Sequence, residues 1–271
     1  MERIDAVFDR LRRERRKALI PFVMGGDPSC PTTGELLVAL EDAGADLIEV
    51  GVPFSDPLAD GPVIQSASAR ALARGATPQR VLAAVASVRH RLQTPVVCLS
   101  YWNPIAQFGG RRGAESAPDA FVRAALASGI SGVIVPDLPL EEGEPLQQAA
   151  RRRRFATIFL AAPTSPPHRL RRVARASSGF IYYVSVTGTT GVRRELPPSL
   201  VHGVRQLKLL TTKPVCVGFG IATPAQAAAV AAVADGVIVG SALVHTIAQA
   251  TSRAAAFRGA VSFLKRLRAS V

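Results

Sequence analysis

Lysine, histidine and cysteine are scarce in this chain of 271 residues, and their placement excludes several kinds of site. The three cysteines, Cys30, Cys98 and Cys216, are far apart and form no Cys-x-x-Cys pair. We expect them to be small core residues, because free cysteine is among the most buried residue types. The four histidines are scattered and none pairs with another at metal-ligand spacing. The sequence therefore predicts no metal site.

Long hydrophobic runs are also missing, although 48% of the residues are hydrophobic. No apolar run approaches the roughly 18 residues that a membrane span needs. The first residues, Met1 to Asp5, carry acids and no long apolar segment, so they do not resemble a signal peptide. We therefore expect a cytoplasmic protein that has no membrane partner.

Acidic residues are outnumbered, which gives a formal net charge of +13. Only four of the 33 basic residues are lysines, so arginine carries the charge, with clusters at Arg10–Lys17, Arg151–Arg154 and Arg169–Arg172. These clusters fall on helical stretches without interleaved aromatic residues or a recognition motif. The arginine clusters are thus interpreted as solvated outer faces of helices rather than as a nucleic-acid-binding surface. A positive field would also attract an anionic substrate or an acidic partner.

Short apolar runs recur along the chain and predict eight strands. They are apolar on both faces, as parallel strands buried under helices are. The predicted strands are Ala18–Val23, Leu47–Val52, Val96–Leu99, Gly132–Val135, Thr157–Ala161, Phe180–Val184, Val215–Gly218 and Gly236–Val239.

Amphipathic stretches between these runs predict helices. The plainest are Thr32–Ala43, Thr77–Leu92, Asp119–Ala127, Leu146–Arg153, Arg169–Ala176, Leu200–Leu209 and Thr223–Val233. Eight such units without a break in composition indicate a single α/β domain over residues 1–271, a (β/α)8 TIM barrel. An extra N-terminal helix, Glu2–Arg13, would close its bottom. An open doubly wound sheet is the alternative, and the lack of a G-x-G-x-x-G turn after the first strand weakens it.

One strand carries an acid in its middle, and a second acid follows on the next loop. Glu49 lies within the apolar run Leu47–Val52, and Asp60 lies in a loop rich in proline and glycine. Burial should raise the pKa of Glu49, so this group could both give and take a proton near neutrality. Buried pairing of Glu49 and simple turn formation by Asp60 are the structural alternatives.

Active sites of such barrels form at the carboxyl ends of the strands. No lysine lies at these strand ends, which argues against a Schiff-base aldolase. General acid–base catalysis by carboxylates is the mechanism that remains. Phe22, Leu99, Leu160 and Tyr182 would line an apolar pocket for a flat ring, unless they only fill the core. Glycines after the last two strands, with Ser241 behind Gly240, favour a phosphate site.

The chain resembles the alpha subunits of tryptophan synthases over essentially its full length. Its most specific motif is the Glu-x-Gly-x-Pro-Phe-Ser-Asp-Pro-x-Ala-Asp-Gly-Pro run that starts at Glu49. The other matching segments are Pro21–Pro28, Tyr101–Pro104, Val133–Pro139, Ala162–Pro166, Tyr182–Gly191, Gly218–Gly220 and Val239–Ser241.

The resemblance implies a reversible retro-aldol cleavage of indole-3-glycerol phosphate to indole and glyceraldehyde 3-phosphate. Glu49 matches the family's general acid/base, and Asp60 matches the acid that binds the indole N–H. Substrate-binding roles follow for Phe22, Leu99, Tyr101, Leu160, Tyr182 and Thr190. A phosphate cradle follows for Gly191, Gly220, Gly240 and Ser241.

The resemblance also implies a partner. Alpha subunits of this family join a beta subunit in an alpha2beta2 complex, and pyridoxal phosphate is expected only in that partner, with no cofactor in this chain. Met24, Trp102 and the long segment Gly109–Pro118 depart from the usual pattern. A free-standing lyase that releases indole alone, a non-catalytic barrel that binds a sugar phosphate, and a nucleic-acid-binding barrel remain open at this point.

Overall fold

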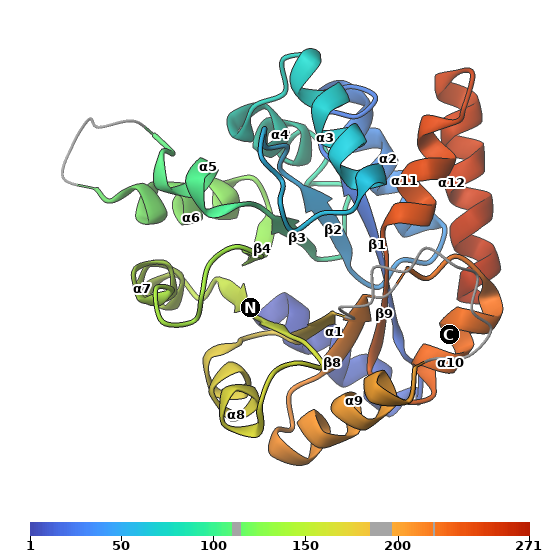
Figure 1. Cartoon of the computed structure of the whole chain (residues 1–271). Coiled ribbons are helices and arrows are strands. Elements are labelled where there is room, and N and C mark those ends of the chain that lie inside the picture. Colours follow the sequence, from blue (N-terminus) through green and yellow to red (C-terminus); the bar gives the residue numbers. More distant parts are fainter. Residues whose placement is uncertain (110–114, 185–196, 219) are drawn as a thin grey trace.

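Nine parallel strands form one sheet that curls into a nearly closed barrel inside a ring of helices (Figure 1). The computed structural model describes residues 1–109, 115–184, 197–218 and 220–271. The strands run in the order β5-β4-β3-β2-β1-β9-β8-β7-β6. They are β1 Ala18–Met24, β2 Ile48–Gly51, β3 Val96–Leu99, β4 Ile130–Ile134, β5 Ala156–Ile158, β6 Leu160–Ala161, β7 Ile181–Val184, β8 Val215–Gly218 and β9 Gly236–Val239.

The eight predicted strands are all present, but the fifth is divided at Phe159. Its first half, β5, pairs with β4, and its second half, β6, pairs with β7. At the bend, the Phe159 N–H donates to the Ser177 hydroxyl at 3.2 Å, and its carbonyl accepts from the Tyr182 N–H at 3.1 Å. One bent segment thus supplies both edges at which the barrel closes, which confirms the predicted fold class.

Helices cover the outside of the barrel, and most of them begin at a proline in the first turn, where its missing N–H costs no hydrogen bond. They are α1 Glu2–Arg13, α2 Cys30–Asp42, α3 Pro62–Ala73, α4 Pro78–Ala86, α5 Trp102–Ala106, α6 Ala117–Ala127, α7 Glu144–Arg152, α8 Pro167–Ala176, α9 Pro198–Leu210, α10 Pro224–Ala231, α11 Ser241–Ala248 and α12 Arg253–Arg268.

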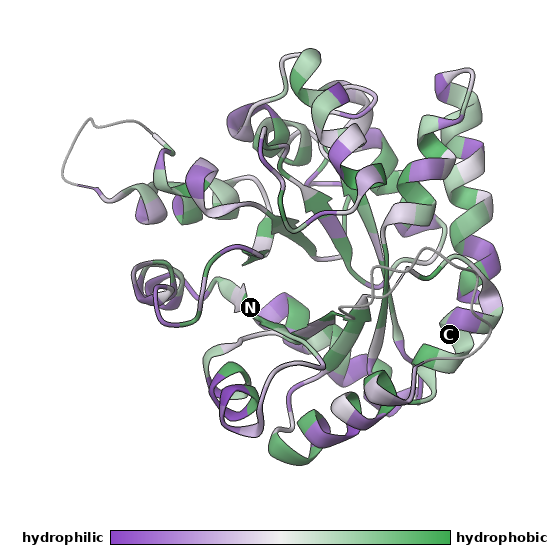
Figure 2. Cartoon of the chain, in the orientation of Figure 1, coloured by the Kyte–Doolittle hydropathy of each residue, from purple (hydrophilic) through white to green (hydrophobic). Residues whose placement is uncertain are grey.

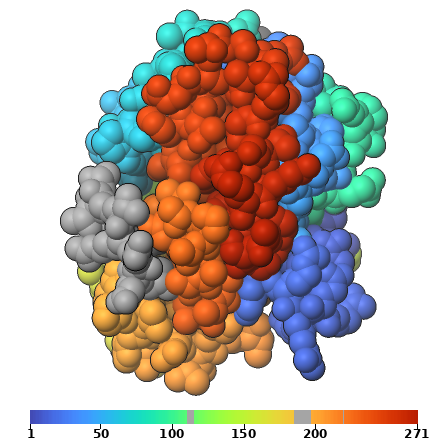
Figure 3. All heavy atoms as spheres, turned by 90° about the vertical axis from the view of Figure 1, so that its right-hand side faces the viewer, coloured from blue at the N-terminus to red at the C-terminus, as the bar shows by residue number. Residues whose placement is uncertain are grey.

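The predicted helices are confirmed with shifted ends, and four further helices escaped the sequence analysis: α3, α5, α11 and α12. α3 is rich in alanine and serine, so it shows little contrast between an apolar and a polar face. In Figure 2 the strands are mostly hydrophobic and the outer helices carry hydrophilic faces. The long helix α12 lies across the outside beside the first segments of the chain (Figure 3), and Arg268 pairs with Asp46 at 2.6 Å.

Helix α1 closes one end of the barrel, as predicted (Figure 1). Its apolar face packs against inward-pointing strand residues, and the rings of Phe8 and Phe180 lie 6.0 Å apart. Ile4 and Leu11 are completely or almost completely buried. This small core fills the lower half of the barrel and leaves the carboxyl ends of the strands for a site.

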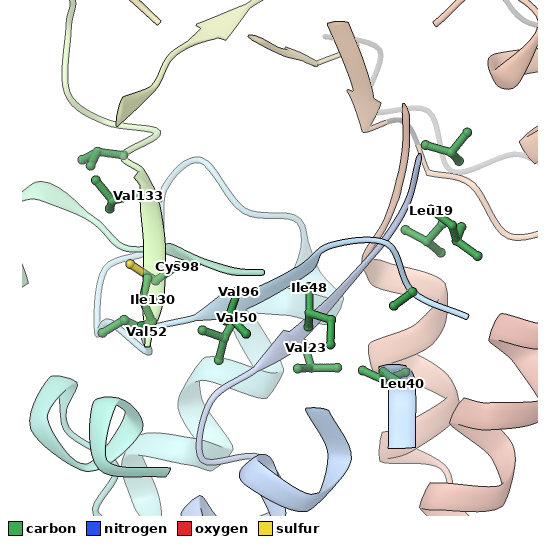
Figure 4. Packing of buried hydrophobic residues seen from close by; sticks show 14 of the residues in the cluster. Leu19, Val23, Leu40, Ile48, Val50, Val52, Val96, Cys98, Ile130 and Val133 are labelled. Atoms are coloured by element: carbon green, nitrogen blue, oxygen red, sulfur yellow. The ribbon is translucent and has the colours of Figure 1, made fainter. Parts of the chain in front are cut away.

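A second and larger core lies between the strands and the outer helices. Figure 4 shows Val23, Ile48 and Val50 pointing to this side with Leu40 of α2. Because alternate strand residues face the barrel interior and the helices, both faces of each strand are apolar. Among the residues that the structure describes, no helix is long and apolar enough to cross a membrane.

Candidate active site

Side chains from five strands gather inside the barrel, above the core that α1 closes. Parallel registers place Phe22 beside Glu49 on β1 and β2, and Leu160 beside Tyr182 on β6 and β7. Leu99 lies at the end of β3 beside Gly51. The structure therefore brings the predicted ring-lining residues to one mouth, around Glu49.

Glu49 is nearly inaccessible to solvent, with 1% of its surface exposed. One of its carboxylate oxygens, Oε2, has no hydrogen-bond partner among the described residues. Burial raises the pKa of Glu49 to about 8, and the charge of Asp60 adds to the effect. A carboxyl group in this environment holds its proton at neutral pH and can deliver it to a bound molecule.

Asp60 approaches the same mouth from the loop between β2 and α3. Burial raises the pKa of Asp60 to about 6, while a hydrogen bond from the Tyr101 hydroxyl acts to lower it. The Tyr101 oxygen also accepts the Ala59 N–H at 3.0 Å, and its ring lies 5.3 Å from that of Phe54. Tyr101 thus holds both the tip of the loop and its carboxylate.

Helix α3 anchors the base of this loop through two residues that sequence reasoning missed. The buried Ser68 hydroxyl accepts the Phe54 N–H at 2.9 Å and donates to the Phe54 carbonyl at 2.8 Å. Gln65 donates to the Asp60 carbonyl at 2.9 Å. The signal available in the sequence was a pair of polar residues three apart, on one face of a segment of small residues.

Tyr182 lies close to Glu49, and a glycine makes room for it. The pKa of the Tyr182 hydroxyl is raised by burial and by the charges of Glu49 and Asp60, so the phenol stays protonated. A Cβ atom at Gly218 would come within 2.5 Å of the Tyr182 oxygen. A Cβ atom at Gly51 would meet the Phe22 ring at 2.7 Å. These two glycines set the shape of the pocket, and only the structure reveals it.

The described residues of the predicted phosphate site, Gly220, Gly240 and Ser241, lie before or at the starts of α10 and α11, and these two helix starts differ in one respect. Thr223 and Gln226 form a capping box at the start of α10, and Gln226 accepts the N–H groups of Ala222 and Thr223. At the start of α11, Gly240 is the N-cap and supplies no side chain. The first N–H groups of α11, from Ser241 onward, therefore remain available for an anion.

Two glycines of the predicted phosphate site leave open space around their backbones. Gly220 adopts a left-handed backbone with φ +40, and a Cβ atom there would touch nothing within 4 Å. A Cβ atom at Gly240 would lie 3.7 Å from Phe22, so the anion site adjoins the ring pocket. The described part of the cradle has the room and the donors that a phosphate group requires.

Comparison with known proteins identifies the family. The family model described as tryptophan synthase alpha chain matches residues 8–269. The chain belongs to this family. It is 50% identical over 249 residues to the tryptophan synthase alpha chain of Geotalea daltonii, covering 92% of this chain and 91% of that one. The alpha chain of Gloeobacter violaceus is 51% identical over 249 residues, covering 92% and 87% of the two chains.

Solved structures of the tryptophan synthase alpha family share the fold. Subunit alpha from Legionella pneumophila strain Paris superposes with a TM-score of 0.88 at 36% identity, covering 99% of this chain and 97% of that one. A chain of Mycobacterium tuberculosis tryptophan synthase reaches a TM-score of 0.89 at 38% identity, covering 99% and 98%.

Two residues predicted for the site fall outside the described residues. Thr190 and Gly191 belong to the segment 185–196 that the structure does not describe. Asp137 accepts the Trp102 N–H at 2.8 Å and caps α5, and the Trp102 ring packs against the outer core. Asp27 pairs with Arg70 at 2.6 Å.

Proposed function

We propose that this chain cleaves indole-3-glycerol phosphate to indole and glyceraldehyde 3-phosphate, as the alpha subunit of a tryptophan synthase. The observation that carries the proposal is the pair of carboxyl groups at one barrel mouth, with pKa values held apart at about 8 for Glu49 and about 6 for Asp60. Near neutral pH the first group is protonated while the second is mainly ionised. Acid and base roles are thus separated before substrate arrives.

The reaction moves one proton from a hydroxyl group to a ring carbon. Protonated Glu49 gives its proton to the indole carbon that carries the glycerol chain, and positive charge develops on the indole nitrogen. Ionised Asp60 accepts the indole N–H and stabilises that charge. As the carbon–carbon bond breaks, the adjacent hydroxyl becomes the aldehyde and its proton returns to Glu49. The cycle balances within these residues and needs no electron acceptor.

The pocket and the cradle orient the substrate for this step. Phe22, Leu99, Leu160 and Tyr182 present apolar surface to the indole ring. The phosphate would bind at Gly220, Gly240 and Ser241, with Gly191 and Thr190, from the segment 185–196, completing the site. Because Gly240 adjoins Phe22, the ring and phosphate subsites share one cavity mouth. Fixed phosphate binding would hold the reacting bond near Glu49.

A beta partner belongs to the proposal. Because membership of the tryptophan synthase alpha chain family implies a beta subunit, we infer an alpha2beta2 partnership here, with pyridoxal phosphate carried by the beta subunit alone. A cytoplasmic location remains a prediction from the sequence and from the biosynthetic role of the family. Nothing observed in the structure favours a free-standing lyase.

The test is indole release from indole-3-glycerol phosphate by the purified chain, alone and with a tryptophan synthase beta subunit. We expect slow release that rises strongly with the partner. Glu49→Gln should abolish release and leave substrate binding, because it keeps the size of the side chain and removes its transferable proton. Arg13→Gln, on the exposed face of α1, serves as the control variant. Gln65→Glu is less suitable because it would add a charge.

Other outcomes would contradict the proposal in different ways. Fast release without a partner would indicate the free-standing lyase. No release under either condition from a folded chain would indicate a binding barrel. Turnover retained by Glu49→Gln would remove Glu49 from its assigned role while leaving the family membership intact.

A further inference from the structure

A second cavity lies at the opposite end of the barrel from the carboxylates. Its volume is about 280 Å³. Its walls come from α1 and from the residues that precede β1, β8 and β9, so it opens at the amino ends of the strands. Phe8, Leu11 and Pro214 form an apolar floor. The arginine cluster that the active site leaves unexplained, Arg10–Lys17, forms much of the rim.

The rim is strongly positive. Four cations, Arg12, Arg15, Arg16 and Lys17, face a single carboxylate, Asp235. That carboxylate is already engaged, because Lys208 lies 2.7 Å from one oxygen and the Val215 N–H donates to the other at 3.0 Å.

Neighbouring acids compensate only part of this charge. Arg16 pairs with Glu14 at 2.9 Å and lies 3.7 Å from the buried Asp46. Arg12 lies 3.4 Å from Asp9, and Lys17 lies 3.8 Å from Asp235. The side chains of the Arg16–Glu14 and Arg12–Asp9 pairs are all at least two-fifths exposed, so solvent screens these two pairs. Arg15 has no ion pair with any residue that the structure describes.

Arg15 also occupies an unusual backbone position. Helix α1 ends in a Schellman motif, in which the Arg16 N–H donates to the Leu11 carbonyl at 2.9 Å and the Arg15 N–H donates to the Arg12 carbonyl at 3.2 Å. Arg15 has φ +55, in the left-handed region where glycine is the usual residue. The sequence therefore keeps a long cation at a strained position on the rim of a cavity.

The chain offers an informative contrast at the end of α7. Arg154 has φ +52 and closes the same motif there. Its guanidinium pairs with Glu2 at 2.7 Å, which gives this side chain a partner within the fold. Arg15 lacks such a partner among the described residues, so its guanidinium is available to bind a ligand from outside the chain.

We propose that this cavity at the amino ends of the strands binds a small organic phosphate. Arginine guanidinium groups match phosphate oxygens with paired hydrogen bonds, and several cations favour a group that carries more than one negative charge. The apolar floor suits a planar or aliphatic part of the same molecule. Because the site lies at the other end of the barrel, it does not depend on the proposed lyase activity.

The test is isothermal titration calorimetry of the full chain with ADP as the probe and adenosine as the uncharged control. An ionic strength of about 0.01 M keeps screening weak. We expect ADP to bind, adenosine to bind far more weakly, and added salt to weaken ADP binding. Arg15→Gly should reduce ADP affinity by about tenfold or more, as the loss of a charge-assisted hydrogen bond does.

Arg15→Gly keeps the test independent of folding. Glycine is favoured at a left-handed helix end, so the melting temperature should stay the same or rise. Arg154→Gly removes the same charge at the same kind of position outside the cavity, and should leave ADP affinity nearly unchanged.

Three results would overturn the proposal. ADP could fail to bind the wild-type chain, adenosine could bind as tightly as ADP, or the two glycine variants could weaken ADP equally. The last result would assign any binding to the net charge of the surface rather than to this cavity.

Discussion

At the scale of single residues, the site depends on two carboxyl groups whose environments differ. Glu49 sits inside a strand with an unpartnered oxygen, whereas Asp60 sits on a loop and accepts a hydrogen bond from Tyr101. The raised pKa of Glu49 was predictable from an acid in an apolar run. The role of Tyr101 in holding Asp60 and its loop was not, because the hydroxyl of Tyr101 contacts this loop at Ala59, which is 42 positions away in the sequence.

The pH dependence of kcat/KM should report both groups. We expect activity to rise with pH as Asp60 ionises near 6 and to fall as Glu49 loses its proton near 8. Tyr101→Phe removes a hydrogen bond that favours ionised Asp60, so the acidic limb should move to higher pH. Rate profiles of wild type and Tyr101→Phe between pH 5 and 9, a range of roughly one pH unit outside both values, measure this.

An acidic limb that stays in place in Tyr101→Phe would separate Asp60 from that limb. Phe54→Leu provides a control, since it removes the ring beside Tyr101 and leaves the hydroxyl that contacts Asp60.

At the scale of elements, the short apolar runs predicted the strands well, whereas amphipathic periodicity predicted the helices unevenly. A strand such as β3 is apolar along its whole length because both of its faces are covered, and such a run is easily recognised. Helix α3 escaped because alanine and serine give little amphipathic contrast. The break at Phe159 escaped because a bend in one continuous apolar run leaves no mark in composition.

Helix α1 offers a test at this scale. Ile4 is fully buried in the core that α1 shares with the inward strand residues. Ile4→Ala should lower the free energy of unfolding by about 2–5 kcal/mol, because it removes buried carbons and leaves a cavity. Urea unfolding followed by circular dichroism measures this, and the exposed Arg13→Ala should change stability by less than about 0.5 kcal/mol. A loss for Ile4→Ala no larger than that of the control would mean that α1 is not docked.

At the scale of the whole molecule, the sequence predicted the barrel, the closed lower end and the mouth that carries the site. It could not predict how the surface charge is distributed, because pairing depends on contacts across the fold. Arg153, for example, reaches Asp119 on a neighbouring helix at 2.7 Å. The excess of arginine is thus partly consumed by ion pairs between helices, and part of it gathers around the lower cavity.

Global stability should also depend on the proton of Glu49. Its pKa is about 8 in the folded chain and near 4.5 when exposed, so the folded state binds the proton more tightly. Its contribution to stability is therefore present at low pH and is lost as the pH rises from about 4.5 to about 8, by at most roughly 5 kcal/mol. Urea midpoints at pH 5 and pH 8 test this, with Glu49→Gln as the comparison. An equal decline in both proteins would show that other groups cause it.

The bend at Phe159 places the shortest ladder of the barrel wall beside the ring pocket. β6 contains only two residues, and the pair that it forms with β7 includes Leu160, a wall of the ring pocket. Elsewhere the wall consists of longer ladders, such as the seven-residue β1 between β2 and β9. Widening the pocket at Leu160 would therefore break fewer backbone hydrogen bonds than widening it at any other strand. A substrate with a bulkier ring would be accommodated by a displacement of β6 rather than of another strand.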